Sequence, residues 1–152
     1  MKKLFLIDAY ALIFRFYYAF IGRPMRNADG VNTSAVFGFV RYINEIIRRE
    51  NPHYLGVAFD PPGGNFRHEL FADYKANRGE TPEDIIVSVP YIKEFLEAMR
   101  IPVIEVPGYE ADDVIGTLSR EAAEAGFEVF MVTPDKDYGQ LIRPNVYIYK
   151  QR

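Results

Sequence analysis

Cysteine is absent from all 152 residues, which excludes disulfides, thiolate metal sites and thiol nucleophiles together. Long apolar runs are absent as well, since none approaches the roughly 18 residues of a membrane span. Asp8 and Arg15 interrupt the apolar N-terminal stretch, and no small-residue cleavage site stands out, which argues against a secretory signal. A Gly-Lys-Ser/Thr phosphate-binding loop is also lacking. We therefore expect neither a membrane protein nor a nucleotide hydrolase of that type.

The residues that are present indicate one packed domain. Apolar residues make up 49% of the chain and aromatic residues 15%, enough for a sizeable core at this length. The net charge is −3, but seven of the 21 acids form the set described below. Without them, 14 acids stand against 18 basic residues, a balance of +4. An acidic pocket on a mildly basic body is compatible with a polyanionic substrate.

Five short apolar runs predict β-strands, and segments with helical spacing lie between them. The strand-like runs are residues 3–7, 54–59, 101–106, 128–132 and 146–149. The helical segments are residues 9–20, 33–49, 81–99 and 110–125. Strands that alternate with helices are typical of a parallel sheet with right-handed crossovers. The predicted fold is therefore α/β, with three layers: a mostly parallel central sheet and helices on both faces.

Local signals support the predicted helix ends. Thr33 and Ser34 are suited to cap one helix, and Pro82 suits the first helical position of the next. Gly126 is expected to end the helix that begins near Glu110. The segment 9–20 carries apolar and aromatic residues almost all round, which predicts a buried helix.

Acidic side chains follow four of the predicted strands at their carboxyl ends. Two of them come directly after a strand, three open the helix after the third strand, and two lie after the fourth. They are Asp8, Asp60, Glu110, Asp112, Asp113, Asp135 and Asp137. In open α/β sheets, sites form outside the carboxyl ends of the strands. Carboxylates gathered there would repel one another unless cations lie among them.

Oxygen ligands without a cysteine cluster favour Mg²⁺ or Mn²⁺ over zinc. Two such ions, about 3.5–4 Å apart, can activate a water and stabilise the leaving oxygen in phosphoryl transfer. Ordinary explanations remain open for part of the set. Acids in the first turn of a helix satisfy its free N–H groups, and Asp135-Lys136-Asp137 also suits a simple turn. Asp8 and Asp60 are harder to explain in this way, because an acid next to core residues needs a partner.

A basic segment follows the second predicted strand. Pro61-Pro62-Gly63-Gly64-Asn65 breaks regular structure, and residues 66–80 read as a mobile loop or a loosely attached helix over the strand ends. On a helix, Tyr74, Lys75 and Arg78 would share one face. An aromatic ring beside cations is typical of single-strand nucleic-acid binding, although a solvated helix face remains the alternative.

These motifs together resemble a known family: the N-terminal 5′-nuclease domain of bacterial DNA polymerase I, within the flap-endonuclease and PIN-like group. The resemblance spans nearly the whole chain, in the family's order. The matching stretches are Leu6-Ile7-Asp8 with Arg15, Gly38-Phe39, Val57-Ala58-Phe59-Asp60, Phe66-Arg67-His68-Glu69, Tyr74-Lys75-Ala76 with Arg78, Thr81-Pro82-Glu83-Asp84, Val106-Pro107-Gly108-Tyr109-Glu110-Ala111-Asp112-Asp113 and Asp135-Lys136-Asp137 with Gln140-Leu141. The Gly-Tyr-Glu-Ala-Asp-Asp stretch with a later Asp-Lys-Asp is the most specific part.

The resemblance implies a role for each candidate residue. The seven acids would ligate two Mg²⁺ ions, for which Mn²⁺ can substitute. Arg15, Lys75 and Arg78 would act on the scissile phosphate, Tyr74 would stack on a base, and Arg67 would join the DNA-binding segment. The implied activity is a 5′-3′ exonuclease and flap endonuclease on DNA and primer RNA in replication and repair.

The resemblance also implies a setting. We expect residues 1–152 to form one domain that stops before a helix–turn–helix DNA-binding region and a polymerase region. The partners would be DNA with a 5′ flap or 5′ end and an RNA–DNA primer junction, with no membrane. The expected state is a monomer covalently linked to the polymerase region, in the bacterial cytoplasm at the nucleoid.

Two other functions remain open from the residues themselves. The chain could bind branched DNA or metal without catalysis, or it could be a PIN-type ribonuclease. An aspartyl phosphatase fits less well, because Asp8 has no second acid two residues later.

Overall fold

The computed structural model describes residues 1–61 and 81–150. Over these residues the chain forms a five-stranded sheet, in which every strand pair is parallel. The strand order is β3-β2-β1-β4-β5. The strands are β1 (Lys3–Asp8), β2 (Tyr54–Ala58), β3 (Val103–Ile104), β4 (Glu128–Val132) and β5 (Val146–Tyr149). The predicted parallel sheet is confirmed.

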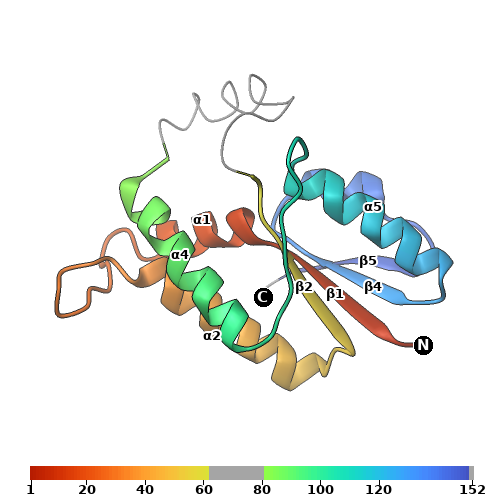
Figure 1. Cartoon of the computed structure of the whole chain (residues 1–152), viewed down its shortest axis with the longest axis horizontal. Helices are drawn as coiled ribbons and strands as arrows, with labels where there is room; N and C mark the ends of the chain where they lie inside the picture. The colour runs from red at the N-terminus through yellow and green to blue at the C-terminus, as the bar shows by residue number, and fades with distance from the viewer. Residues whose placement is uncertain (62–80, 151–152) are drawn as a thin grey trace.

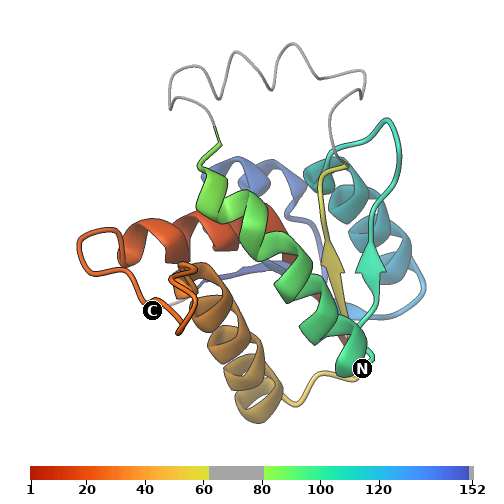
Figure 2. The ribbon, with the colours of Figure 1, turned by 60° about the vertical axis from the view of Figure 1, so that its left-hand side comes forward.

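Four α-helices and a 3₁₀ turn cover the sheet in the part of the chain described. They are α1 (Ala9–Ala19), α2 (Ser34–Glu50), α4 (Glu83–Ala98), α5 (Ala111–Glu124) and η1 (Lys136–Leu141). Helices α1, α2 and α4 lie together on one side of the sheet, and α5 lies on the other (Figures 1 and 2). The three-layer α/β prediction is therefore confirmed.

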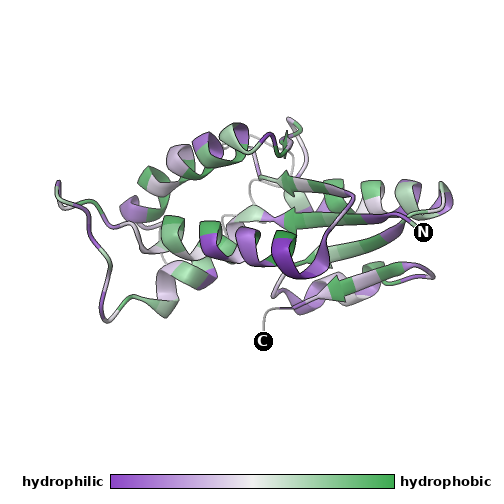
Figure 3. Ribbon diagram, turned by 90° about the horizontal axis from the view of Figure 1, so that it is seen from below, coloured by the Kyte–Doolittle hydropathy of each residue, from purple (hydrophilic) through white to green (hydrophobic). Residues whose placement is uncertain are grey.

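The alternation of side chains along the strands builds two cores. Phe5 and Ile7 of β1 point into the cluster with α1, α2 and α4, whereas Leu6 between them belongs to the cluster with α5. Because both faces are covered, the central strands read as continuous apolar runs. Figure 3 shows the hydrophobic colour along the strands, while hydrophilic and hydrophobic turns alternate along the helices.

Four local predictions need correction. Helix α1 is buried on one face only, at Leu12, Ile13 and Phe16, while Arg15 and Tyr18 are exposed. Because aromatic residues also lie on its other side, the number of apolar residues alone wrongly predicted a helix buried all round.

The other three corrections concern a strand and two helix starts. The run 101–106 forms only the two-residue strand β3 at the sheet edge. Prolines at 102 and 107 lack an N–H and limit its pairing. Thr33 precedes α2 but makes no side-chain capping hydrogen bond, and its hydroxyl instead donates to the Met25 carbonyl at 3.3 Å. Pro82 lies one residue before α4 rather than at its first position.

No helix among residues 1–61 and 81–150 combines the length and apolarity required to cross a bilayer. The end of α5 agrees with its prediction, since Gly126 follows it with a φ of 97°. The basic segment from Phe66 to Glu80 lies outside the described residues.

Candidate metal site at the carboxyl ends of the strands

Asp8 lies at the centre of the site because β1 is the middle strand. It is the last residue of β1 and the N-cap of α1, and only 8% of it is exposed. Its carboxylate accepts two hydrogen bonds. The Tyr138 hydroxyl donates to Oδ2 at 2.8 Å, and the Ala11 backbone N–H donates to Oδ1 at 3.4 Å.

Burial raises the pKa of Asp8 to about 7. The hydrogen bond from Tyr138 opposes this shift by favouring the charged form, and the negative charges of Asp60 and Asp112 add to it. The charges of Asp60 and Asp112 thus act on the Asp8 carboxylate. The site is therefore one where a positive charge would be strongly favoured.

Asp60 connects the end of β2 to the start of α5. Its Oδ1 accepts a hydrogen bond from the Ala111 backbone N–H at 2.7 Å. Ala111 is the first residue of α5, so Asp60 satisfies one of the N–H groups that a helix N-terminus leaves without an intrahelical partner. This contact holds the acid-bearing turn of α5 against the sheet edge.

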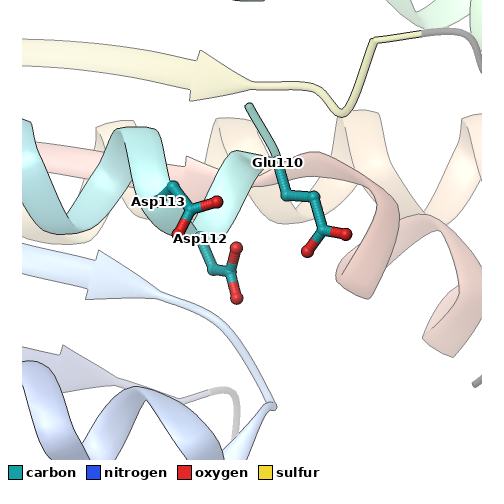
Figure 4. A group of neighbouring side chains, drawn as sticks. All are labelled: Glu110, Asp112 and Asp113. Carbon is teal, nitrogen blue, oxygen red and sulfur yellow. The ribbon is translucent and has the colours of Figure 1, made fainter. Parts of the chain in front are cut away.

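Glu110, Asp112 and Asp113 form one compact group at the start of α5. Each offers a carboxylate oxygen, and these oxygens lie within 4.8 Å of one another. Glu110 is the N-cap residue, and the two aspartates belong to the first turn. Figure 4 shows the three side chains side by side, in the region toward which the arrowheads of the neighbouring strands point.

The donors of this group suit a hard divalent cation. All are partly buried carboxylate oxygens, which Mg²⁺ and Mn²⁺ accept and which suit zinc less well than nitrogen or sulfur. In the described part of the chain this is the one set of three or more potential ligands so closely spaced. The residues present therefore fit one divalent ion directly, with Asp8 and Asp60 near it.

Asp135 and Asp137 are placed differently from the other acids. They follow β4 at η1, where the Asp137 backbone N–H donates to Asp135 Oδ1 at 2.9 Å. The Asp135 N–H in turn donates to the Thr133 hydroxyl at 3.1 Å. Asp137 is exposed, and neither acid belongs to the compact group at α5. The ordinary turn considered for Asp135-Lys136-Asp137 is thus present, and their role as metal ligands stays a prediction.

The cationic candidates are only partly described. Arg15 is exposed on α1. Arg67, Tyr74, Lys75 and Arg78 lie outside the described residues, so their roles stay predictions. His53 is not a ligand candidate, because its Nδ1 accepts the Lys3 backbone N–H at 3.0 Å.

Tyr138 is a site residue that the sequence did not reveal. It is 2% exposed and packs in the core cluster that α5 shares with the sheet, yet its hydroxyl reaches Asp8 across 130 residues of sequence. A tyrosine after two acids and a lysine has no pattern that marks it as a partner of Asp8. Only the packing of Tyr138 in the core cluster that contains Leu6 of β1 brings the two together.

Known proteins share this sequence and this fold. A "5'-3' exonuclease" of Aquifex aeolicus (strain VF5) is 40% identical over 148 residues, which are 97% of this chain and 50% of that protein. A "DNA polymerase I" of Bacillus caldotenax is 43% identical over 148 residues, 97% of this chain and 16% of the polymerase. The chain thus spans half the length of the first relative and far less of the second.

A solved structure of the T5 5′-exonuclease with divalent metal ions (zinc) bound has the same fold. It matches with a TM-score of 0.69 at 21% identity, over 98% of this chain and 55% of that one. The sequence model of one family, described as "5'-3' exonuclease, N-terminal resolvase-like domain", matches residues 3–152. With a family match of this extent and a relative at 40% identity, the chain belongs to the 5′-3′ exonuclease family as its N-terminal resolvase-like domain.

Proposed function

We propose that this chain is the nuclease domain of a protein that hydrolyses phosphodiester bonds in DNA at a 5′ end or 5′ flap, and in primer RNA joined to DNA. The observation that carries the proposal is the group Glu110, Asp112 and Asp113, held at the carboxyl edge of a parallel sheet beside Asp8. The relatives named for 5′-3′ exonuclease and DNA polymerase I support the same activity. Because they are longer than this chain, the proposed activity is that of a whole protein of their kind.

The cofactor in this proposal is Mg²⁺, bound as two ions and replaceable by Mn²⁺. Glu110, Asp112 and Asp113 would hold one ion, and Asp8, Asp60, Asp135 and Asp137 would complete the ligand set directly or through water. When bound, such ions activate water and stabilise the leaving oxygen. The contribution of the chain itself is rigidity, because the strand ends and the first turn of α5 fix the carboxylates before any ion arrives.

The cations would act on the substrate. Arg15, Lys75 and Arg78 would offset the charge that develops on the scissile phosphate. Tyr74 would stack on a base near it, and Arg67 would contact the DNA backbone. Stacking and phosphate contacts carry little sequence information, so the domain would recognise the shape of the DNA rather than its sequence.

Asp113→Asn is the test of this proposal. The change keeps the shape of the side chain but removes a charged ligand from the compact group. Cleavage of a labelled 5′-flap duplex by the full-length protein with Mg²⁺ is expected to fall by about 100-fold or more, since outer partners of metal ligands are already worth 10- to 100-fold. Glu121→Gln is the control, because Glu121 is an exposed acid near the other end of α5.

Equal cleavage by the wild type and Asp113→Asn would contradict the proposal. The same assay separates it from its alternatives. Binding of flap DNA without cleavage products would favour a non-catalytic module. In that case, the slope of the logarithm of the binding constant against the logarithm of salt concentration would give the number of phosphates contacted. Preferential cleavage of single-stranded RNA would favour a PIN-type ribonuclease.

The setting of this activity is part of the proposal. We place it in the bacterial cytoplasm at the nucleoid, in a monomer whose chain continues into a polymerase region. The expected helix–turn–helix region beyond residue 152 stays a prediction. The two relatives described above are bacterial proteins, and one of them is named DNA polymerase I, which agrees with this placement.

A further inference from the structure

Tyr138 makes a direct contact with the most buried acid of the site. Its hydroxyl donates to Asp8 Oδ2 at 2.8 Å, and the bond is buried. Tyr138 belongs to η1, whereas Asp8 ends β1. The bond therefore joins the turn after β4 to the central strand at the edge where the acids gather.

The ring of Tyr138 is fixed by packing. It is 2% exposed and belongs to the core cluster with Leu6, Ala111, Ile115 and Met131. Ala111 and Ile115 belong to the helix that carries the three-acid group. The same ring thus contacts a cluster that includes β1, β4 and α5, so the position of its hydroxyl is set by all three elements.

The hydroxyl donates its one proton to the Asp8 carboxylate, and the carboxylate oxygen accepts it as a hydrogen bond. A carboxylate offers about four lone-pair positions on its two oxygens. Tyr138 occupies one on Oδ2 and the Ala11 N–H one on Oδ1, which leaves acceptor capacity on both oxygens for a cation.

We propose that Tyr138 is a positioning residue of the metal site, which holds the Asp8 carboxylate in the orientation that meets a divalent ion. The inference rests on the proposed function, because it takes Asp8 as part of the ligand set. Hydrogen-bond partners of metal ligands fix ligand orientation, and their loss typically weakens metal affinity or activity by 10- to 100-fold. Tyr138 has the geometry of such a partner.

Tyr138→Phe in the full-length protein tests this role, because it removes the donor and keeps the ring. Tyr149→Phe is the matched control. Tyr149 also donates from its hydroxyl to a carboxylate, Glu50 Oε2 at 2.9 Å, but Glu50 ends α2 and does not belong to the acidic set. The readouts are the Mn²⁺ dissociation constant from electron paramagnetic resonance, and kcat and KM for flap DNA as functions of Mg²⁺ concentration.

Tyr138→Phe is expected to weaken Mn²⁺ binding by about 10- to 100-fold and to raise the Mg²⁺ concentration for half-maximal kcat by a similar factor. The KM for DNA should stay within about twofold of wild type, and Tyr149→Phe should match wild type in all three. A purely structural role would lower the thermal midpoint without changing Mn²⁺ affinity measured well below it. That result, or equal Mn²⁺ affinity in the two tyrosine variants, would overturn the inference.

Asp8→Asn separates the inference from the function on which it rests. If Asp8→Asn binds Mn²⁺ and cleaves DNA as wild type does, the assignment of Asp8 to the metal site fails. If Asp8→Asn is impaired and Tyr138→Phe is normal, only the positioning role fails. A double variant covers the case in which Tyr138→Phe does not fold, because Asn removes the buried charge. Adding Tyr138→Phe to Asp8→Asn should then leave Mn²⁺ affinity unchanged, and a further loss would show that Tyr138 does not act through Asp8.

Discussion

At the scale of single residues, Asp8 shows the conflict that a buried acid creates. It follows three fully or nearly fully buried side chains of β1, and burial raises its pKa to about 7. Near neutral pH its charged form is costly in a metal-free chain. A bound cation would offset the cost of the buried negative charge, so this site is suited to a positively charged ligand.

The pH dependence of stability should report Asp8 directly. Its pKa rises from 3.8 to about 7 on folding, so the folded state binds the proton more tightly. The stability that the folded state gains by binding this proton more tightly is fully present below about pH 4. It is lost as pH rises to about 7, at about 1.4 kcal/mol per pH unit. Without divalent ions, the free energy of unfolding should therefore fall between pH 5 and pH 8 by more in wild type than in Asp8→Asn. Denaturant titrations at both pH values measure this, and parallel changes in the two proteins would refute it.

At the scale of elements, the contact between α1 and α2 depends on one glycine. A Cβ at Gly38 of α2 would lie 2.6–2.9 Å from carbon atoms of Phe16 on α1. The helices therefore approach at a distance that only glycine allows, in the layer that supports Asp8 at the start of α1.

Gly38→Ala should destabilise the chain despite the helix propensity of alanine. Alanine gains roughly 0.5–1 kcal/mol over glycine in a helix, but overpacking a core costs typically about 1–3 kcal/mol. Gly116→Ala is the matched control in α5, where the new Cβ would meet the end of Leu141 at 3.2 Å, a side chain that can shift. The thermal midpoint of unfolding should be lower for Gly38→Ala than for wild type, and clearly lower than for Gly116→Ala. The reverse order would contradict the packing argument.

The link between β2 and α5 can be separated from metal binding. Asp60→Asn keeps an oxygen that can accept the Ala111 N–H, whereas Asp60→Ala removes it. Loss of a side-chain acceptor at a helix N-terminus costs typically about 1 kcal/mol. Without metal, Asp60→Ala should therefore lower the free energy of unfolding more than Asp60→Asn does. Both variants should bind Mg²⁺ more weakly than wild type. Equal unfolding energies for the two variants would show that the contact does not stabilise the helix start.

At the scale of the whole molecule, the sheet order creates the site. β1 lies between β2 and β4, and β3 pairs with β2, so acids after β1, after β2 and after β3 approach one another. The crossovers place α5 on the opposite face from α1, α2 and α4 (Figure 1). The site therefore draws on segments from the whole chain, and its stability is that of the fold.

A divalent ion should stabilise the folded chain as a whole. An ion that binds only the folded state at 100 times its dissociation constant adds about 2.7 kcal/mol to the free energy of unfolding. Mg²⁺ should raise the thermal midpoint, and Asp113→Asn should reduce that rise. NaCl at the same ionic strength is the control, and an equal shift with NaCl would mean that screening rather than binding stabilises the chain.

Much of the fold could be predicted because its signals are local. The five apolar runs became the five strands, and the helical segments became α1, α2, α4 and α5 within a few residues. The predictions that failed were the length of β3 at the sheet edge, the burial of α1 on all sides, and the roles of Thr33 and Pro82 at two helix starts. An apolar residue count does not say which side of a helix meets the sheet.

The sequence by itself determined which residues could carry the chemistry: carboxylates after strands, a lack of thiols, and the order of the family motifs. Strand-like apolar runs and helical spacing are local patterns of a few residues, so they can be recognised without the fold. Tertiary structure alone decided which acids share a site. It placed the Asp60 carboxylate on the Ala111 N–H at the start of α5, 51 residues away, and the Tyr138 hydroxyl on Asp8 across 130 residues. Such contacts depend on strand order and core packing, which join parts of the chain that no local pattern relates.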